Sequence, residues 1–317
     1  MMKTGRLGVG IVGCGKVGGV LGSALRSVGH SVVGVSAGSA QSKERAAAML
    51  PGVPVVSVEE VVERCELVFL TVPDRELPGL VQGLATLGAW QPGQLVIHTC
   101  GAHGVDILEP ASARGALPLA IHPAMTFTGT SIDVARLAGC PFAVTAAPVL
   151  QPIAQALVVE MGGEPVLVEE QARPLYHAAL AHGANHLLTV VTQAMRALKA
   201  SGVEDPSTFA QPLLQAALDR ALQEGEDGLS GPVIRGDAST VAAHVKVLAQ
   251  AARAADMDEA ALGNDGEALN KLANPRLHDV AQTYRFLAET TAQRANERGA
   301  LNDLLTRNIL DALGPEK

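Results

Sequence analysis

The chain has 317 residues, of which 48% are hydrophobic and 18% charged, enough apolar material for two folded domains and too little charge for a disordered chain. Acidic residues outnumber basic ones by 32 to 24, which gives a net charge of −8, and aromatic residues make up only 3%. Such a chain repels phosphate backbones and lacks the aromatic platforms of single-strand binders, so we expect no nucleic-acid partner.

Cysteine usage and hydropathy bear on location. The chain has four cysteines, none in a C-x-x-C pair: Cys14, Cys65, Cys100 and Cys140. This spacing suits a reducing compartment and speaks against a zinc site. Residues 11–14 have the form of a lipoprotein cleavage box, but the apolar stretch before the cysteine is shorter than the roughly 7–15 residues of a signal sequence. No apolar run approaches the roughly 18 residues of a membrane span. We therefore expect a cytoplasmic protein with no membrane partner.

Short apolar runs alternate with helical or polar stretches along the first half of the chain. The runs are Leu7–Val12, Ser31–Val35, Leu67–Val72, Leu95–Thr99, Leu119–Ile121, Phe142–Thr145 and Val166–Val168. Runs that are apolar at every position suit strands covered on both faces, and their alternation with helices is typical of βαβ units. The sequence therefore predicts an α/β Rossmann domain, with a mostly parallel, doubly wound sheet, over residues 1–169.

From about residue 170 the pattern changes to helical spacing without a convincing strand. The helical stretches are Tyr176–Ser201, Pro206–Gln223, Ser239–Ala254 and Leu277–Leu313. Pro174 fits the first turn of a helix, which places the boundary nearby. We predict an all-helical domain over residues 170–317. Its Ala- and Leu-rich stretches carry more apolar surface than a thin bundle buries alone, so we also predict a homodimer joined through this domain.

The strongest motif is a G-x-G-x-x-G sequence between the first strand and the first helix. Its first glycine allows a tight turn, its second lets backbone N–H groups approach a pyrophosphate, and its third lets the helix pack on the strand. The helix N-terminus adds unpaired donors and a partial positive charge. The predicted cofactor-binding residues here are Gly13, Cys14, Gly15, Lys16, Val17 and Gly18. The alternative is a flexible glycine turn.

The tip of the second strand indicates which dinucleotide binds. An acidic residue at this place holds the ribose 2′-hydroxyl of NAD, whereas hydroxyls and cations suit the 2′-phosphate of NADP. The tip contains no carboxylate, and its predicted cofactor-binding residues are Ser36, Ala37, Gly38 and Ser39. Lys43 and Arg45 follow, either as phosphate ligands or as an exposed helix face. The sequence therefore favours NADP.

The next two strand ends also carry polar residues at the edge where open α/β sheets bind ligands. The residues predicted to line the ribose and nicotinamide are Val72, Pro73 and Asp74, and then Thr99, Cys100 and Gly101. Asp74 has an alternative role as a helix N-cap. Cys100 is interpreted as a packing residue rather than a nucleophile, because nothing near it in the sequence pairs with it.

These motifs, with residues 121–127 (I-H-P-A-M-T-F), 176–185 and 229–238, resemble a family of NADP-dependent oxidoreductases. That family joins a Rossmann-like domain to a helical C-terminal domain of unknown function. The layout is more distantly similar to ketopantoate reductase, pyrroline-5-carboxylate reductase, and the 6-phosphogluconate and 3-hydroxyisobutyrate dehydrogenases. The resemblance covers nearly the whole chain. It implies a dimer with a cleft between the domains, and it implies no substrate.

One departure from these relatives concerns the proton donor. The β-hydroxyacid dehydrogenases carry a catalytic lysine four residues before an asparagine, but here Ala181 precedes Asn185. The Tyr-x-x-x-Lys pair is absent as well, since Leu180 follows Tyr176. Histidine is then the natural donor, although a lone histidine is more often structural. The candidate catalytic residues are His122, His177, His182 and Asn185. His182 and His186 have metal-ligand spacing without a third ligand, so we expect no metal.

The leading hypothesis is an NADP-dependent oxidoreductase for a small oxo or hydroxy acid or an imine, with ketopantoate reduction as its most concrete form by fold analogy. One alternative is a non-catalytic NADP(H)-binding sensor, which the missing lysine motivates. Another is an oxidoreductase that passes hydride between NADP(H) and a deazaflavin.

Overall fold

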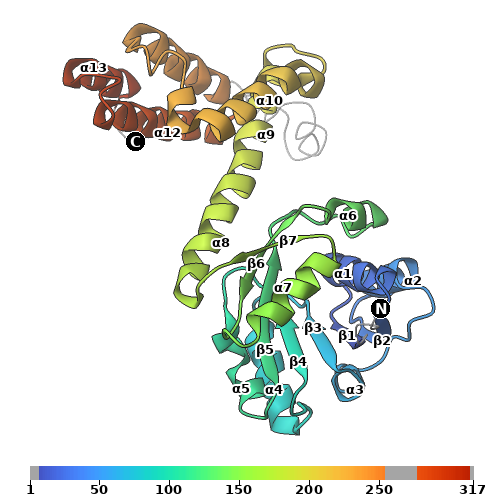
Figure 1. The fold of residues 1–317 in the computed structure, drawn as a ribbon. Helices are drawn as coiled ribbons and strands as arrows, with labels where there is room; N and C mark the ends of the chain where they lie inside the picture. Colours follow the sequence, from blue (N-terminus) through green and yellow to red (C-terminus); the bar gives the residue numbers. More distant parts are fainter. Residues whose placement is uncertain (1–6, 254–276, 315–317) are drawn as a thin grey trace. The chain divides into compact units, whose positions relative to one another are not determined.

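The computed structural model describes residues 7–253 and 277–314. Contacts divide the chain into two compact units, Met1–Ala181 and His182–Lys317 (Figure 1). The predicted domains, 1–169 and 170–317, differ from these units by α8 (Arg173–Ala181) and the residues before it. Helix α8 belongs to the N-terminal unit because its first residue is bonded to the sheet.

The N-terminal unit is built on a seven-stranded sheet in the order β2-β1-β3-β4-β5-β6-β7. Neighbouring strands are parallel except for the antiparallel pair β5 and β6. The strands are β1 (Gly8–Val12), β2 (Ser31–Ser36), β3 (Leu67–Leu70), β4 (Leu95–His98), β5 (Leu117–Pro123), β6 (Pro141–Thr145) and β7 (Glu164–Leu167). The predicted Rossmann-type sheet is confirmed, and each predicted run overlaps one of its strands.

Helices cover both faces of this sheet, with α1 and α7 on one face and α3 and α4 on the other. The helices of the unit are α1 (Lys16–Ser27), α2 (Ala40–Met49), α3 (Val58–Arg64), α4 (Leu77–Leu87), α5 (Glu109–Ser112), α6 (Ser131–Arg136), α7 (Gln151–Glu160) and α8, with the 3-10 turns η1 (Val105–Leu108) and η2 (Glu170–Ala172). Successive residues of a strand point to opposite faces of the sheet, so their side chains pack in two different hydrophobic clusters. Ile11 and Phe69 pack with the α1 and α7 side, whereas Val12 and Leu70 pack with the α3 and α4 side. This alternation explains why the runs are apolar at every position.

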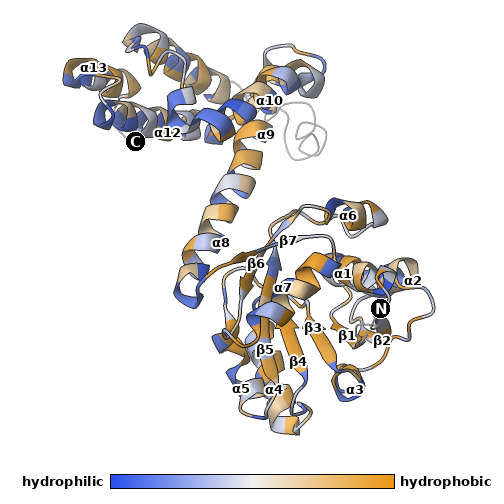
Figure 2. Ribbon diagram, in the orientation of Figure 1, coloured by the Kyte–Doolittle hydropathy of each residue, from blue (hydrophilic) through white to orange (hydrophobic). Residues whose placement is uncertain are grey.

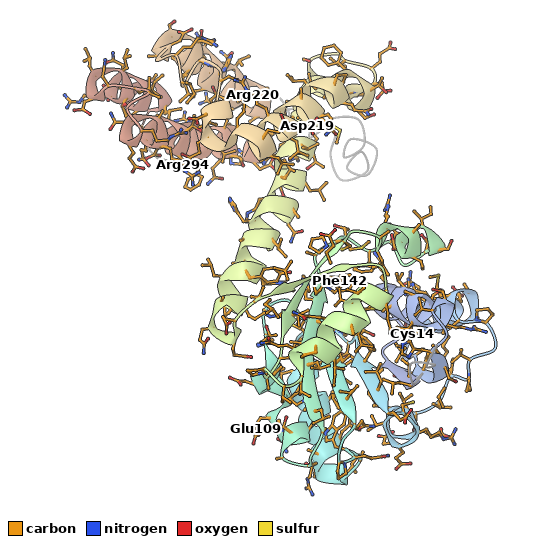
Figure 3. The ribbon with its side chains drawn as sticks, in the orientation of Figure 1. Cys14, Glu109, Phe142, Asp219, Arg220 and Arg294 are labelled. Carbon is orange, nitrogen blue, oxygen red and sulfur yellow. The ribbon has the colours of Figure 1, made fainter. Side chains whose placement is uncertain are left out.

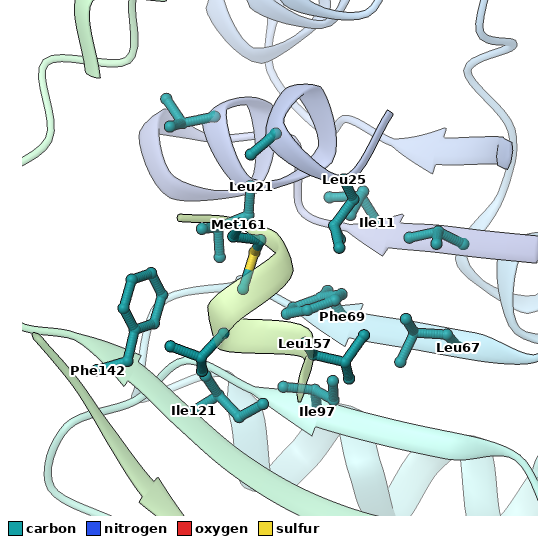
Figure 4. Close-up of a cluster of buried hydrophobic side chains, with 14 of the residues drawn as sticks. Ile11, Leu21, Leu25, Leu67, Phe69, Ile97, Ile121, Phe142, Leu157 and Met161 are labelled. Atoms are coloured by element: carbon teal, nitrogen blue, oxygen red, sulfur yellow. The ribbon is translucent and has the colours of Figure 1, made fainter. Parts of the chain in front are cut away.

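The core beside α1 and α7 is the larger cluster of buried side chains. Figure 4 shows Leu21 and Leu25 of α1 and Leu157 of α7 over the strand residues Phe69 and Ile97. The strands are correspondingly among the most hydrophobic parts of the ribbon (Figure 2). Burying such side chains contributes about 1.5–3 kcal/mol each. The sheet is therefore a rigid framework for the loops that follow its strands.

The chain changes direction across the sheet at β1. It passes from β1 to β2 on one side and then to β3 on the other. Because β1, β3, β4 and β5 are parallel, the loops after them lie at one edge of the sheet. Open α/β sheets bind ligands at such a switch point, beside the carboxyl ends of the strands.

The second unit is helical throughout its described residues, as predicted. Its elements are the π-helical turn η3 (His182–His186), α9 (Leu187–Ala200), α10 (Pro206–Glu224), the 3-10 turn η4 (Gly225–Gly228), residues 238–253, α12 (His278–Glu297) and α13 (Asp303–Leu313). The predicted stretch Leu277–Leu313 is two helices, separated by a turn at Gly299 with φ +74°. Ala254, the end of another predicted stretch, lies outside the described residues. In the described parts, no helix has the length and apolar character needed to cross a bilayer.

Candidate functional site

The glycine-rich loop between β1 and α1 uses its three glycines in different ways. Gly13 has φ +89°, in the left-handed region that favours glycine. A methyl group on Gly18 would overlap Thr71 Oγ1 and lie 2.6 Å from the Gly13 carbonyl oxygen, so α1 packs on β1 only with glycine there. A methyl group on Gly15 would meet only the Gly13 oxygen, at 3.9 Å. Backbone conformation therefore explains why glycine occupies position 13, and close packing explains why it occupies position 18. The space beside Gly15 is open.

Two hydroxyls brace this loop from the sheet. Ser36 Oγ accepts a hydrogen bond from Gly13 N at 3.0 Å, and the Ser36 carbonyl accepts one from Cys14 N at 2.8 Å. Thr71 donates its hydroxyl proton to the Gly13 carbonyl at 2.6 Å. The Cys14 side chain is fully buried within the N-terminal unit (Figure 3), so only its backbone belongs to the loop surface. Thr71 directly follows β3, at the strand end predicted to line the ribose and nicotinamide, and its hydroxyl supports the glycine loop.

The start of α1 is equipped for an anion. No side chain caps this end, and the first turn contains no acidic residue. Its backbone donors and partial positive charge therefore suit a phosphate. Lys16 is exposed here, and Val17 is half-buried. Arg45 of α2 borders the same place, because a methyl group on Gly129 would lie 2.7 Å from Arg45 Nε and 3.0 Å from Lys16 Cγ. The side chains of Lys16 and Arg45 thus lie close to the uncapped start of α1.

A buried carboxylate holds the loop that carries Gly129. Asp133 is fully buried and accepts hydrogen bonds from Thr128 N and Gly129 N, both at 2.7 Å, and from the Thr128 hydroxyl at 3.0 Å. Burial by itself would raise the pKa of Asp133, but these hydrogen bonds outweigh it and lower the pKa. The carboxylate stays ionised and keeps Gly129 beside Lys16.

The tip of β2 is open. Ser39 is the N-cap of α2, and its hydroxyl accepts a hydrogen bond from Ser42 N at 3.1 Å. Ala37 is half-buried and Gly38 is exposed, with nothing within 4 Å of a methyl group placed on Gly38. Of the two tip hydroxyls predicted to face the cofactor, Ser36 thus braces the glycine loop and Ser39 caps a helix.

The loops after β3 and β4 meet at Asp74 and Cys100. Pro73 and Asp74 are exposed, whereas Val72 and Thr99 are half-buried. The N-cap of α4 is Glu76, so the alternative role of Asp74 as a helix cap is wrong. Asp74 instead hydrogen-bonds with the Cys100 thiol, whose pKa is raised to about 11 by burial first and then by Asp74. Cys100 is thus a protonated, buried group at neutral pH.

His98, the last residue of β4, shapes the loop that leads to Gly101. Its ring is fully buried, with Nε2 donating to the Gly104 carbonyl at 2.6 Å and Nδ1 accepting from Cys100 N at 3.2 Å. Only a neutral imidazole satisfies both bonds. Burial lowers the pKa of His98 to about 4, in agreement with this role.

Three polar rings gather beside Gly101. His122 of β5 lies with its Nδ1 2.8 Å from the hydroxyl oxygen of Tyr176 on α8. The ring centroids of His122 and His177 are 6.1 Å apart. A methyl group on Gly101 would overlap His177 Nδ1 and come within 3.0 Å of His122 Nε2. The structure therefore brings together three predicted residues, Gly101, His122 and His177, and adds Tyr176.

One ring nitrogen of His177 is buried beside Gly101. Its Nδ1 faces Gly101, is buried, and has no hydrogen-bond partner. In the tautomer that carries its proton on Nε2, this N–H group is available to donate to a ligand.

Arg173, the first residue of α8, fastens this helix to the sheet. It is fully buried and donates to Thr145 Oγ1 at 2.8 Å, to the Ala120 carbonyl at 3.0 Å and to the Ala143 carbonyl at 3.1 Å. Within the described residues it forms no ion pair, and its Nη1 has no hydrogen-bond partner. Burial lowers the pKa of Arg173, and Tyr176, Glu170 and Cys100 oppose that change, so the guanidinium keeps its charge beside the Tyr176 ring.

This charge acts on the neighbouring rings. The pKa of His122 is lowered to about 4, by burial first and then by Arg173 and His177, against an opposing effect of Asp74. Burial raises the pKa of Tyr176, and Arg173 opposes that rise. The guanidinium carbon of Arg173 lies 5.9 Å from the Tyr176 ring centroid. At neutral pH His122 is therefore uncharged and Tyr176 keeps its proton.

The remaining predicted catalytic residues lie in the helical unit. His182 and Asn185 are exposed, and His182 Nδ1 is 2.8 Å from His186 Nδ1. The Asn185 carbonyl accepts a hydrogen bond from the Thr189 hydroxyl at 3.2 Å. No group of three metal-ligating side chains occurs among residues 7–253 and 277–314. The catalytic roles of His182 and Asn185 stay predictions.

Solved structures from several organisms share this fold. A Bacteroides fragilis protein to which NADP oxidoreductase activity is ascribed is 19% identical, with a TM-score of 0.68 over 91% of this chain and 99% of that one. The Myxococcus stipitatus imine reductase in complex with NADP+ is 16% identical, with a TM-score of 0.57 over 95% and 99%. The Plasmodium falciparum pyrroline carboxylate reductase with NADP bound is 12% identical, with a TM-score of 0.52 over 72% and 86%.

Sequence families account for most of the chain. No curated protein sequence matches it. Residues 1–123 match the Rossmann-like domain, and residues 140–291 match a domain of unknown function, DUF2520. The second match begins just before β6, so it includes the last two strands of the sheet and α8 as well as helices of the second unit. The chain is thus a protein in which a Rossmann-like domain is followed by a DUF2520 domain.

Proposed function

We propose that this protein is an NADP-dependent oxidoreductase that transfers hydride between NADP(H) and the C=O or C=N bond of a small molecule, such as an oxo acid or an imine. One observation carries the proposal: the braced glycine loop and the His122–Tyr176 pair lie at the same edge of one sheet. Dinucleotides bind at that edge, and reduction of a polar double bond needs a proton donor beside it.

The structural neighbours support this reaction class. Two of them are named as reductases and hold NADP or NADP+. Ketopantoate reduction remains the most concrete oxo-acid version, by analogy of fold alone. The paired rings beside Gly101 favour an enzyme over a non-catalytic NADP(H)-binding module, because a module has no need of a proton donor.

The residues present fit the cofactor. When bound, NADPH supplies the hydride. The open space at Gly15 and the uncapped start of α1 would accept the pyrophosphate. Lys16 and Arg45 would neutralise phosphate charge, and the Nε2–H group of His177 would orient the oxygen or nitrogen of the substrate.

The test of this function is consumption of NADPH, followed by its absorbance, with a panel of 2-oxo acids and cyclic imines. Binding is measured separately through NADPH fluorescence. Turnover of any member supports the proposal. Tight binding of NADPH without turnover of any compound in the panel would instead support the alternative of a non-catalytic NADP(H)-binding sensor.

NADPH is expected to bind about tenfold or more tightly than NADH, because a 2′-phosphate gains charge-assisted hydrogen bonds of about 1.5–3 kcal/mol each. Arg45→Ala should remove most of this preference, since Arg45 lies on α2, the helix that begins at the β2 tip, where a ribose 2′-phosphate would be held. Lys43→Ala, which changes an exposed lysine on the same helix, should leave it unchanged. Titrations that give equal or reversed affinities for the two dinucleotides would contradict the assignment of NADP.

The protein is expected to be a homodimer through its helical unit. Apolar side chains that are more than a third exposed occur on α9, α10 and α12: Leu187, Leu188, Val190, Phe209, Leu213, Leu218, Leu222, Phe286 and Leu287. Soluble monomers rarely expose so much apolar surface. Light scattering should report a dimer at micromolar concentration, and Leu213→Glu should weaken it. Val149→Glu, at an 80% exposed position of the N-terminal unit, is the control. A monomeric wild type would refute the dimer.

A further inference from the structure

The pair formed by Tyr176 and His122 is placed for proton transfer. The two rings meet edge to face, with centroids 5.6 Å apart and an interplanar angle of 87°. Their hydrogen bond, 2.8 Å between hydroxyl oxygen and Nδ1, joins a group that keeps its proton at neutral pH to a neutral imidazole. In the tautomer with the proton on Nδ1, His122 donates to the phenol oxygen and leaves the hydroxyl proton free for another acceptor.

The other nitrogen of His122 connects the pair to solvent. Of the ring nitrogens around Gly101, only His177 Nδ1 is both buried and unpartnered among the described residues. The Nε2 of His122, which makes no hydrogen bond to the described protein, therefore still reaches water. A neutral imidazole with one nitrogen on a phenol and the other on water can take up a proton at Nε2 while releasing one from Nδ1.

Arg173 supplies the electrostatic condition for this transfer. Its buried guanidinium forms no ion pair within the described residues, although Glu170 acts on it at longer range, and it lies 5.9 Å from the Tyr176 ring centroid. In the low dielectric of the interior, such a charge stabilises a negative charge on the phenol oxygen and disfavours a positive charge on His122. Both effects suit a phenol that gives up its proton while its histidine partner stays neutral.

We propose that Tyr176 is the proton donor of this oxidoreductase, that His122 restores its proton from solvent, and that Arg173 is a positioning residue that stabilises the transient phenolate. This rests on the function proposed above. The hydride forms a C–H bond at the carbon of the C=O or C=N group, and the π electron pair moves to the oxygen or nitrogen. That atom takes the Tyr176 proton. His122 then returns a proton from Nδ1 as Nε2 takes one from hydronium or a buffer acid in solvent. Exchange with solvent afterwards returns the ring to the tautomer with its proton on Nδ1, which resets the pair. One NADPH and one proton are consumed, and NADP+ is released.

The chain contains a matched control for this pair. Its only other tyrosine, Tyr284, lies in the helical unit with its hydroxyl 2.9 Å from His244 Nδ1. These rings have a centroid distance of 5.7 Å and an interplanar angle of 78°, close to the values for Tyr176 and His122. In the described residues no cation stacks on Tyr284, and burial alone raises its pKa.

The experiment compares Tyr176→Phe and His122→Asn with Tyr284→Phe and His244→Asn, using the panel member that the wild type reduces fastest. Tyr176→Phe should lower kcat by about 10²–10⁴-fold without changing the affinity for NADPH, and His122→Asn should also lower kcat. The two helical-unit variants should match the wild type. Wild-type kcat should stay level between pH 6 and pH 8, because a phenol still holds its proton there.

Several outcomes overturn the proposal. A kcat that falls through pH 6.5 would identify a histidine as the acid, and unchanged kcat in Tyr176→Phe would exclude the phenol. Loss of NADPH binding in Tyr176→Phe would indicate a structural role. If the wild type binds NADPH but reduces nothing in the panel, the reductase function fails, and the donor fails with it.

A spectroscopic experiment measures directly how Arg173 affects the pKa of Tyr176. In a Tyr284→Phe background Tyr176 is the only tyrosine, so phenolate absorbance against pH gives its pKa. Arg173→Met should raise that pKa, and Arg173→Lys, which keeps the charge, should restore it. Equal pKa values in the folded Met and Lys variants would remove Arg173 from the proposal.

Discussion

Gly15→Ala is expected to weaken NADPH binding by about ten- to a hundredfold while leaving the N-terminal unit folded. Gly15 has extended backbone angles, φ −80° and ψ −159°, and a methyl group there would meet no protein atom closer than 3.9 Å. The same methyl would stand before the uncapped donors of α1. Losing hydrogen bonds from those donors to a charged phosphate costs about 1.5–3 kcal/mol each.

Gly18→Ala should behave differently. Its methyl would overlap Thr71 Oγ1 and lie 2.6 Å from the Gly13 oxygen, so the unit itself should lose about 1–3 kcal/mol along with binding. Trp90, the only tryptophan, is buried in this unit, and its fluorescence reports unfolding of the unit. Gly79→Ala, at an exposed position of α4 with nothing within 4 Å, is the control. Gly15→Ala with wild-type affinity would remove the glycine loop from the cofactor site.

The N-terminal unit is expected to lose about 3 kcal/mol of stability through His98 alone as the pH falls from 6.5 to 4. The pKa of His98 is 6.5 for an unperturbed ring and about 4 in the fold, and (6.5 − 4) at about 1.36 kcal/mol per unit gives this magnitude. Between pH 6.5 and pH 4 the His98 ring binds a proton in the unfolded chain but not in the folded chain, because in the fold its Nδ1 already accepts a hydrogen bond from Cys100 N. Above pH 6.5 the effect vanishes, and below pH 4 it stops growing.

Denaturant unfolding followed by Trp90 fluorescence at a series of pH values measures this loss. His122, with a pKa of about 4, adds to the slope in the same window. His98→Gln should flatten the slope even if it lowers stability at neutral pH, whereas His278→Gln, an exposed position of the helical unit, should not. Asp133, whose pKa is lowered, acts at more acidic pH, where its protonation weakens the loop bonds. An unchanged slope in His98→Gln would show that this ring is protonated without cost.

The fold was predictable because its signals are local. Seven short, mostly apolar runs alternate with helical stretches, and the runs that form the central strands β1, β3 and β4 are buried on both faces, as their composition predicts. The glycine spacing was equally local. The role of Ser36 could not be predicted from a local signal. A polar residue at the tip of β2 is usually interpreted as a cofactor contact, whereas the Ser36 hydroxyl accepts a hydrogen bond from Gly13 N. The cytoplasmic location stays a prediction.

The ring cluster was only half predictable. His122 and His177 were candidates because of their residue type and their place near a strand end and a helix start. Tyr176 lies 54 positions after His122, and nothing in the sequence pairs the two. Arg173 was not a candidate, because no pattern in the sequence marks it as a buried residue bonded to the sheet. Burial and long-range pairing are tertiary facts, and they decide which polar side chains a site contains.

The anchoring of α8 by Arg173 has a consequence for how this architecture diversifies. Because that arginine bonds to β5 and β6, the proposed acid and the dinucleotide loop share one rigid module. The geometry of the Tyr176–His122 pair and of the glycine loop is therefore set within the N-terminal unit. Substitutions beyond Ala181 should leave that geometry unchanged, so the proposed proton donor and the dinucleotide loop can be kept while the helical unit changes in evolution.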